Sequence, residues 1–401
     1  MHQLERQPNS LLTCILKPCL IMMALLLSAC QSPKPFNIKN NYTQQDLFLD
    51  DLFNSADPLP DTEQIFELTP EQEHDFIKAF NSFSYRSLSD SERIYKYLSS
   101  RLQQFNFHAD TLMASESLSQ STGNCLSLAI VTRALAKLVN VGTTFELART
   151  EPIFQLQNNI QLTSQHIRSV VYVKEIRNTR QYVNPNNKIR IDYFPTLGSR
   201  TLRKVPKEEF FAMFYINRAA EAIINDQNDV AYWHLKEAIK LQADNTKAIN
   251  MLGVLYRRIG NELAAERVFK YGLSLQTEQL ELLNNYHKLL VKADRLDEAS
   301  EVAKQLKNHK NNDPFNWIDL ANAELKEKNY TNAIKYFNKA IELAEYLHQP
   351  YAGIAHAHFM LDRPNRAIEA INLALLNTRH KKTQSIYQAK YDYFKSKSNI
   401  N

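Results

Sequence analysis

The C-terminal half of this chain carries an alanine at every thirty-fourth position: Ala231, Ala265, Ala299, Ala333 and Ala367. Most of these alanines have a second small residue twelve positions earlier and a bulky residue four positions later. Small residues at helical spacing let two antiparallel helices approach closely, and the bulky residues fill the seam between neighbouring pairs. The pattern predicts five stacked helix pairs over residues 212–381, followed by a basic capping helix over 382–398.

This 34-residue period resembles the tetratricopeptide repeat, and the best matches lie at residues 252–269 and 317–337. The third repeat departs from the pattern, with His287 at a small-residue position and Ala303 at a bulky one. The alternative, an ordinary helical bundle, does not explain five alanines in register. The resemblance implies a concave groove that binds a peptide or protein partner.

The N-terminus combines basic residues with a short apolar run over residues 19–27, which ends in Leu27-Ser28-Ala29-Cys30. The run is too short to span a bilayer, which needs roughly 20 apolar residues. The segment resembles a bacterial lipoprotein signal, which implies a signal peptide over residues 1–29 and a lipid on Cys30. Gln31 follows the cysteine in place of Asp, which implies a lipid-anchored protein of the cell envelope, at the outer membrane and facing the periplasm. An ordinary secretory signal or a misassigned start codon is the alternative.

The composition excludes several classes of function. The formal net charge is only +5 and is dispersed, which argues against nucleic acid binding. Seven glycines and no Gly-rich loop argue against a nucleotide fold, and the cysteine spacing offers no zinc site. We therefore expect neither a cofactor nor a metal. The basic stretch at residues 200–207 is interpreted as a solvated loop rather than a site for an acidic substrate.

Between the leader and the repeats, the chain divides into a tether and a mixed domain. Residues 30–66 are polar and contain several prolines, which predicts a flexible tether. Residues 67–205 begin with two helices, the first with a capping box at Thr69 and the second starting at Ser89. Strand patterns then follow at 143–149, 153–157, 167–174, 181–183 and 188–194. Residues 206–401 are predicted to be all-helical.

Cys125 is the single thiol left after the predicted processing, and an exported protein risks oxidation by keeping one. Asn124 is a plausible N-cap for a helix that starts at Cys125, where the positive end of the helix dipole favours a thiolate. The sequence therefore predicts a nucleophile with a lowered pKa. Retention of a buried cysteine by chance is the alternative.

A nucleophilic cysteine needs a base and a group that orients the base. His166 is the histidine between Cys125 and the repeats, and it precedes an apolar strand. Asp192 interrupts another apolar strand, and a buried aspartate needs a partner. Each also has a plain interpretation, as a surface loop histidine and a solvent-facing aspartate. Asn184 or Asn186 is an alternative orienting residue.

The order Cys125, His166, Asp192, on a helix and then two strands, resembles the transglutaminase-like papain-type superfamily over residues 70–200. The resemblance implies an α+β fold, with helices packed on an antiparallel sheet, followed by the all-α repeat solenoid. It implies an envelope-anchored cysteine hydrolase or acyltransferase that acts on a protein or peptide amide, with the repeats recruiting a partner or substrate. The chain departs from many members of the family in having Asp192-Tyr193 where they have Asp-Pro. A catalytically silent scaffold lipoprotein that binds partners through its repeats is the alternative.

Overall fold

The computed structural model describes residues 41–55, 58–103, 105–107, 110–157, 160–177, 180–193, 200–275, 280–308, 313–378 and 381–398. The predicted signal peptide and Cys30 lie outside these residues. No helix among the described residues is both long and apolar enough to cross a bilayer.

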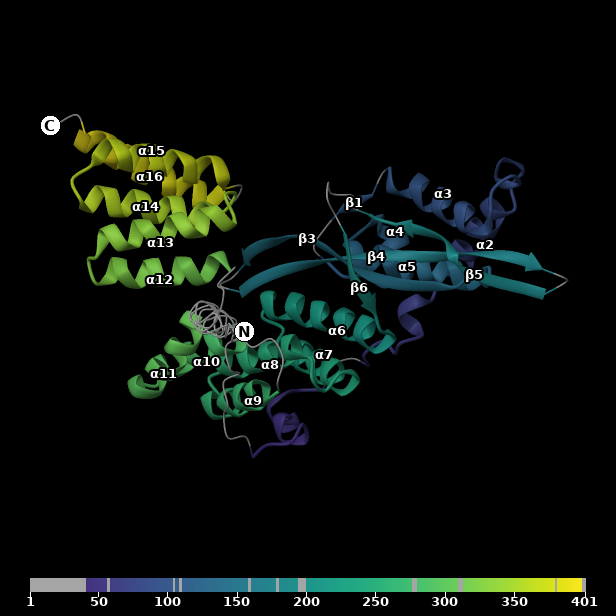
Figure 1. The fold of residues 1–401 in the computed structure, drawn as a ribbon, viewed down its shortest axis with the longest axis horizontal. Coiled ribbons are helices and arrows are strands. Elements are labelled where there is room, and N and C mark those ends of the chain that lie inside the picture. The colour runs from purple at the N-terminus through teal and green to yellow at the C-terminus, as the bar shows by residue number, and fades with distance from the viewer. Residues whose placement is uncertain are drawn as a thin grey trace, which may run out of the picture.

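A group of short helices precedes and covers the central sheet (Figure 1). These helices are α2 (Pro70–Phe80), α3 (Asp90–Leu102), α4 (Ala114–Gln120) and α5 (Cys125–Leu138). The capping box predicted at Thr69 is confirmed, and Ser89 forms a second one, because each side chain accepts a hydrogen bond from the backbone at the third helical position. The mostly buried α5 packs against α3 and the sheet. A short parallel pair, β1 (Asn106–Phe107) and β2 (Thr122–Gly123), lies just before it.

The central sheet is antiparallel and has the strand order β5-β4-β3-β6. Its strands are β3 (Thr143–Gln157), β4 (Ile160–Arg177), β5 (Arg180–Ile191) and β6 (Arg200–Val205). The sequence divided β3 into two strands, at 143–149 and 153–157, because a register shift between Ala148 and Ile153 interrupts the alternation within β3. It also predicted two strands, at 181–183 and 188–194, where β5 is continuous to Ile191. The prediction of a solvated loop at 200–207 is wrong: β6 pairs with β3, and its basic side chains remain exposed.

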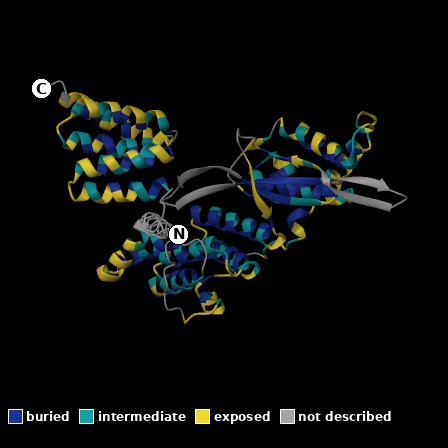
Figure 2. Cartoon of the chain, viewed as in Figure 1, coloured by how far each residue is buried: buried dark blue, intermediate teal, exposed yellow. Residues whose placement is uncertain are grey.

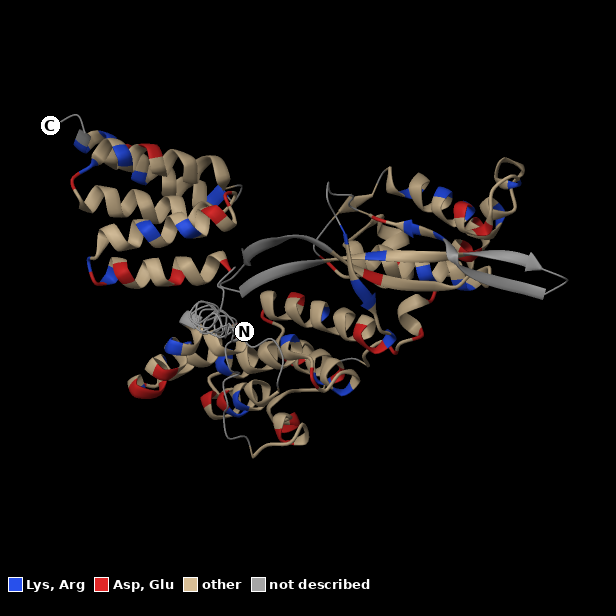
Figure 3. Cartoon of the chain, in the orientation of Figure 1, with Lys and Arg blue, Asp and Glu red and all other residues tan. Residues whose placement is uncertain are grey.

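Five helix pairs follow, as the 34-residue period predicts. They are α6 (Lys207–Ile224) with α7 (Asn228–Leu241), α8 (Thr246–Arg258) with α9 (Glu262–Ser274), α10 (Leu280–Lys292) with α11 (Leu296–Asn308), α12 (Pro314–Lys326) with α13 (Tyr330–Leu343), and α14 (His348–Met360) with α15 (Pro364–Asn377). The capping helix α16 (Lys381–Ser398) closes the series and buries Tyr387 and Phe394. Acidic and basic residues are interspersed along these helices in the view of Figure 3.

The buried core does not divide at residue 205. One cluster extends from the N-terminal segment through the sheet and α5 into α6–α11, and Phe145 of β3 stacks on Phe210 of α6 with ring centroids 3.8 Å apart. A second cluster lies within α12–α16 (Figure 2). The division falls just after the third repeat, the repeat whose key positions depart from the pattern. The Lys288–Asp319 ion pair, at 2.6 Å, nevertheless joins α10 to α12.

The prediction of a flexible tether is wrong for the described part of residues 41–66. This segment has the short 3-10 helices Gln45–Leu47, Asp50–Leu52 and Gln64–Phe66, and it lies along the first two repeats. Phe53 stacks on Tyr232 with ring centroids 4.0 Å apart. The Tyr256 hydroxyl donates a 2.8 Å hydrogen bond to the carbonyl of the fully buried Leu47. A few well-placed apolar and aromatic contacts therefore hold a segment whose composition is polar.

Candidate functional site

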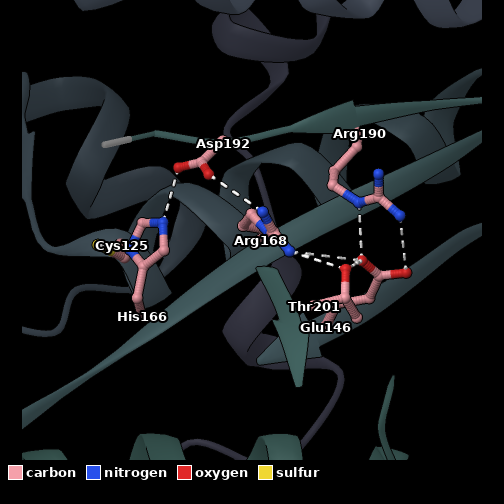
Figure 4. Close-up of polar contacts among 7 residues, drawn as sticks. All are labelled: Cys125, Glu146, His166, Arg168, Arg190, Asp192 and Thr201. Atoms are coloured by element: carbon pink, nitrogen blue, oxygen red, sulfur yellow. Dashed lines mark hydrogen bonds and ion pairs between the residues drawn. The ribbon is translucent and has the colours of Figure 1, made fainter. Parts of the chain in front are cut away.

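The structure brings Cys125, His166 and Asp192 together, although Asp192 lies 67 positions after Cys125 in the sequence (Figure 4). The Cys125 Sγ lies 3.7 Å from His166 Nδ1, and His166 Nε2 lies 2.6 Å from Asp192 Oδ1. His166 is only 8% exposed, whereas the Asp192 side chain is 18% exposed and Cys125 is half-buried. The thiol, the imidazole and the carboxylate thus form one linear series.

Local sequence fixes the position of Cys125. Asn124 is the N-cap of α5, and its Oδ1 accepts hydrogen bonds from the backbone N–H groups of Leu126 (2.9 Å) and Ser127 (3.0 Å). The predicted N-cap is therefore confirmed, and Cys125 is the first residue of the helix. Gly123 has a φ of +143°, a conformation that residues with a Cβ rarely adopt, and it brings the chain sharply into the helix.

The prediction of a lowered thiol pKa is wrong. Burial raises the pKa of Cys125 from its ordinary 9.0 to about 12, the negative charge of Asp192 acts in the same direction, and a backbone hydrogen bond only partly opposes them. Loss of solvation thus outweighs the favourable position at the helix N-terminus. Cys125 is therefore a thiol at neutral pH unless a base takes its proton. That proton transfer must come before or during any nucleophilic attack.

Tyr193, the residue after Asp192, ties this position to both neighbouring elements. Its buried hydroxyl donates to Ser169 Oγ of β4 at 2.7 Å and lies 2.6 Å from Thr132 Oγ1 of α5. Asp192 itself lies directly after the end of β5. The chain therefore anchors the carboxylate through the tyrosine that follows it.

A polar network continues from Asp192 across the sheet, with Arg168 and Glu146 buried and with Thr201 and Arg190 exposed (Figure 4). The Arg168 guanidinium, 6% exposed, lies 3.4 Å from Asp192 Oδ2 and donates to Thr201 Oγ1 at 2.8 Å. Thr201 in turn donates to Glu146 Oε2 at 2.9 Å, and Arg190 Nε donates to the same oxygen at 2.8 Å. Burial acts to raise the pKa of Glu146, but the hydrogen bonds from Arg190 and Thr201 and the nearby cations hold it below its ordinary value.

Sequence reasoning missed Arg168, Glu146, Thr201 and Tyr193 as parts of this site. Glu146 and Arg168 are direct partners in the β3–β4 register, so they lie opposite one another on one face of the sheet. Charged residues inside otherwise apolar strands were the available signal. The alternative orienting residues, Asn184 and Asn186, lie on β5, and their side chains are outside the described part of the structure. Among the described residues no cluster of three or more potential metal ligands occurs.

Comparisons with known proteins identify the repeats. A family model described as tetratricopeptide repeat matches residues 316–346, which cover most of α12 and all of α13. Superkiller protein 3 of Schizosaccharomyces pombe is 23% identical over 171 residues, which are 41% of this chain and 12% of that protein. The chain thus spans only a small part of this relative. Residues 316–346 of this chain therefore match a tetratricopeptide repeat, and the neighbouring helix pairs share its 34-residue period.

Solved structures also align with the chain at low similarity. That of PilF from Pseudomonas aeruginosa is 15% identical, covers 48% of this chain and 100% of its own, and has a TM-score of 0.38. That of YrrB, described as a TPR protein with an unusual peptide-binding site, is 17% identical, covers 46% of this chain and 93% of its own, and has a TM-score of 0.30.

Proposed function

We propose that this chain binds a protein or peptide partner through its tetratricopeptide repeats. The observation that carries the proposal is the repeat identified at residues 316–346, within five helix pairs of the same period. Solenoids of this kind present extended binding surfaces along their stacked helices. Two amide pairs join successive first helices of the pairs, Asn250 with Asn285 at 2.9 Å and Asn284 with Asn316 at 2.7 Å. Asn250 and Asn285 are half-buried, and an amide can make more hydrogen bonds than the one that joins them, which suits an extended peptide backbone.

The test is partner binding by the full chain. Partners captured by chemical crosslinking and identified by mass spectrometry are titrated against the wild type and the double variant Asn250→Ala/Asn285→Ala. We expect binding about tenfold weaker, which corresponds to about 1.4 kcal/mol. Asn372→Ala, at an exposed position of α15, serves as the matched control. Equal affinity for all three proteins would contradict binding through these first helices.

We propose a second function for the Cys125–His166–Asp192 series: attack on a protein or peptide amide, in a transglutaminase-like domain over residues 67–205. The observation that favours it is a pair of contacts: Cys125 Sγ lies 3.7 Å from His166 Nδ1, and His166 Nε2 lies 2.6 Å from Asp192 Oδ1. In this arrangement the same ring faces the thiol with one nitrogen and the carboxylate with the other. The carboxylate then orients the ring and stabilises the imidazolium that forms when the ring accepts the thiol proton.

The chemistry follows from the high pKa of the thiol. His166 Nδ1 accepts the Cys125 proton as the sulfur forms a bond to the amide carbonyl carbon. The C–N bond then breaks, the leaving amine takes the proton from the imidazolium, and a thioester remains on Cys125. Water, deprotonated by His166, hydrolyses the thioester to a carboxylic acid and restores the thiol. A second amine in place of water would give transamidation, and hydrolysis is favoured because water is abundant.

Alkylation of Cys125 by iodoacetamide across pH 6–10 tests this second function. A thiol controlled only by its burial reacts slowly until the pH approaches about 12. A Cys–His pair reacts near neutral pH, and this reactivity is lost in His166→Ala and reduced in Asp192→Asn. His74→Ala, at an exposed position of α2, is the matched control. Identical alkylation rates across this pH range for the wild type and His166→Ala would refute the cysteine chemistry. The catalytically silent scaffold, which acts through its repeats alone, would then be the remaining function.

We propose, finally, that Cys30 is lipidated and anchors the protein in the cell envelope, at the outer membrane and facing the periplasm. The support is the apolar run followed by Leu27-Ser28-Ala29-Cys30. Membrane fractionation of the wild type and Cys30→Ser, with mass spectrometry of the N-terminal peptide, tests the anchor. We expect a diacylated Cys30 in the wild type and loss of the variant from the membrane fraction. An unmodified wild-type N-terminus would refute it.

A further inference from the structure

The first helix of the repeat array, α6, binds the segment that precedes the candidate site. Thr111 of that segment is fully buried, and three side chains of α6 bond three of its atoms. Glu221 Oε1 accepts from its backbone N–H at 2.6 Å, Asn217 Nδ2 donates to its hydroxyl oxygen at 3.0 Å, and Arg218 Nη1 donates to its carbonyl at 3.4 Å. The backbone and side chain of Thr111 are thus both held by the repeat helix.

Thr111 is also bonded to the residue that caps the cysteine helix. Asn124 Nδ2 donates to the Thr111 hydroxyl oxygen at 2.7 Å. Because the amide nitrogen of Asn124 is directed to Thr111, its oxygen faces the first N–H groups of α5. Ser127 supports the same junction, since its hydroxyl accepts from the Leu112 N–H at 2.9 Å. A continuous series of hydrogen bonds therefore runs from α6 through Thr111 and Asn124 to the start of the helix at Cys125.

We infer that Thr111 is a positioning residue through which the first repeat helix holds Cys125 at its distance from His166. The α6 helix is then part of two units at once, the partner-binding array and the support of the thiol. A partner that shifts α6 on binding changes the position of Asn124, and with it the environment of Cys125. The consequence for catalysis rests on the proposed cysteine chemistry, whereas the positioning itself is measured on the thiol.

Alkylation of Cys125 by iodoacetamide in the full chain tests the inference. Thr111→Val removes the hydroxyl acceptor while keeping the shape, Thr111→Ser restores the acceptor, and Asn217→Ala removes only the donor on α6. We expect Thr111→Val and Asn217→Ala to change the rate constant by about fivefold and to shift the pH profile, since one hydrogen bond contributes about 1 kcal/mol. Thr111→Ser and the distant control Asn372→Ala keep the wild-type profile.

The outcomes separate this inference from the proposed function. Wild-type rates and pH profiles in folded Thr111→Val and Asn217→Ala would overturn the positioning role. Near-ultraviolet circular dichroism identifies folded variants, and Asn217→Ala carries the test alone if Thr111→Val fails to fold. The proposed cysteine chemistry fails by a different result, a profile that His166→Ala does not alter. A profile altered by Thr111→Val but not by His166→Ala upholds the positioning and refutes the chemistry.

Discussion

Glu221 offers a quantitative test of how α6 meets the candidate site. Its side chain is 19% exposed, with Oε2 3.6 Å from Arg218 Nη1. Burial raises the pKa of Glu221 from its ordinary 4.5 to about 7, the negative charge of Asp110 adds to this, and the Thr111 N–H and Arg218 oppose it. The folded protein therefore binds a proton on Glu221 that the unfolded chain has already released between about pH 4.5 and 7.

The sign of the effect follows from linkage. A carboxyl whose pKa is raised by folding contributes its full stability at low pH and loses it as the pH rises through about 7. At about 1.4 kcal/mol for each pH unit, the loss between pH 5 and pH 8 is about 2–3 kcal/mol. Glu221→Gln cannot ionise and escapes this loss. The variant therefore gains about 2–3 kcal/mol relative to the wild type on going from pH 5 to pH 8.

The assay is denaturant unfolding at both pH values, in a Trp317→Phe background so that Trp233 of α7 reports on the first core cluster. Any effect of the Glu221→Gln side-chain amide that does not depend on pH cancels, because only the change in unfolding free energy between the two pH values is compared. Glu208→Gln, at an exposed position on the first turn of α6, is the matched control. A stability difference between Glu221→Gln and wild type that is the same at pH 5 and pH 8 would refute the reasoning.

Three further substitutions test the structure at separate places. A Cβ at Gly253 would lie 2.4 Å from Cε1 of Phe269, so Gly253→Ala should lower the unfolding free energy by about 1–3 kcal/mol, and unchanged chemical denaturation would mean that the ring yields freely. Asn124→Ala removes the acceptor for two backbone N–H groups and should cost about 1 kcal/mol by the same measurement, whereas an intact midpoint would deny the cap its role. Phe53→Ala removes a buried ring stacked on Tyr232 and should cost about 3 kcal/mol, a loss that a flexible tether would not produce.

The candidate site could be predicted in part. The sequence identified Cys125 by its helix start, His166 by its place before a strand, and Asp192 by its charge within an apolar strand. It could not supply the distances among them, because these depend on which strands pair and in what register. Arg168 and Glu146 were missed for the same reason: they become partners only when β3 and β4 align. The direction of the Cys125 pKa was also mispredicted, because the helix dipole is visible in the sequence and burial is not.

The sequence by itself determined the repeat helices, because each depends on contacts within a 34-residue unit and its neighbours. It also determined the caps at Thr69, Ser89 and Asn124, which are bonds between residues two or three positions apart. Only the tertiary structure decided that the described residues of the segment 41–66 pack on the repeats and that Thr111 links α6 to Asn124. These contacts join residues that lie far apart in the chain, and their free energy comes from desolvation and geometry that exist only after the chain has folded.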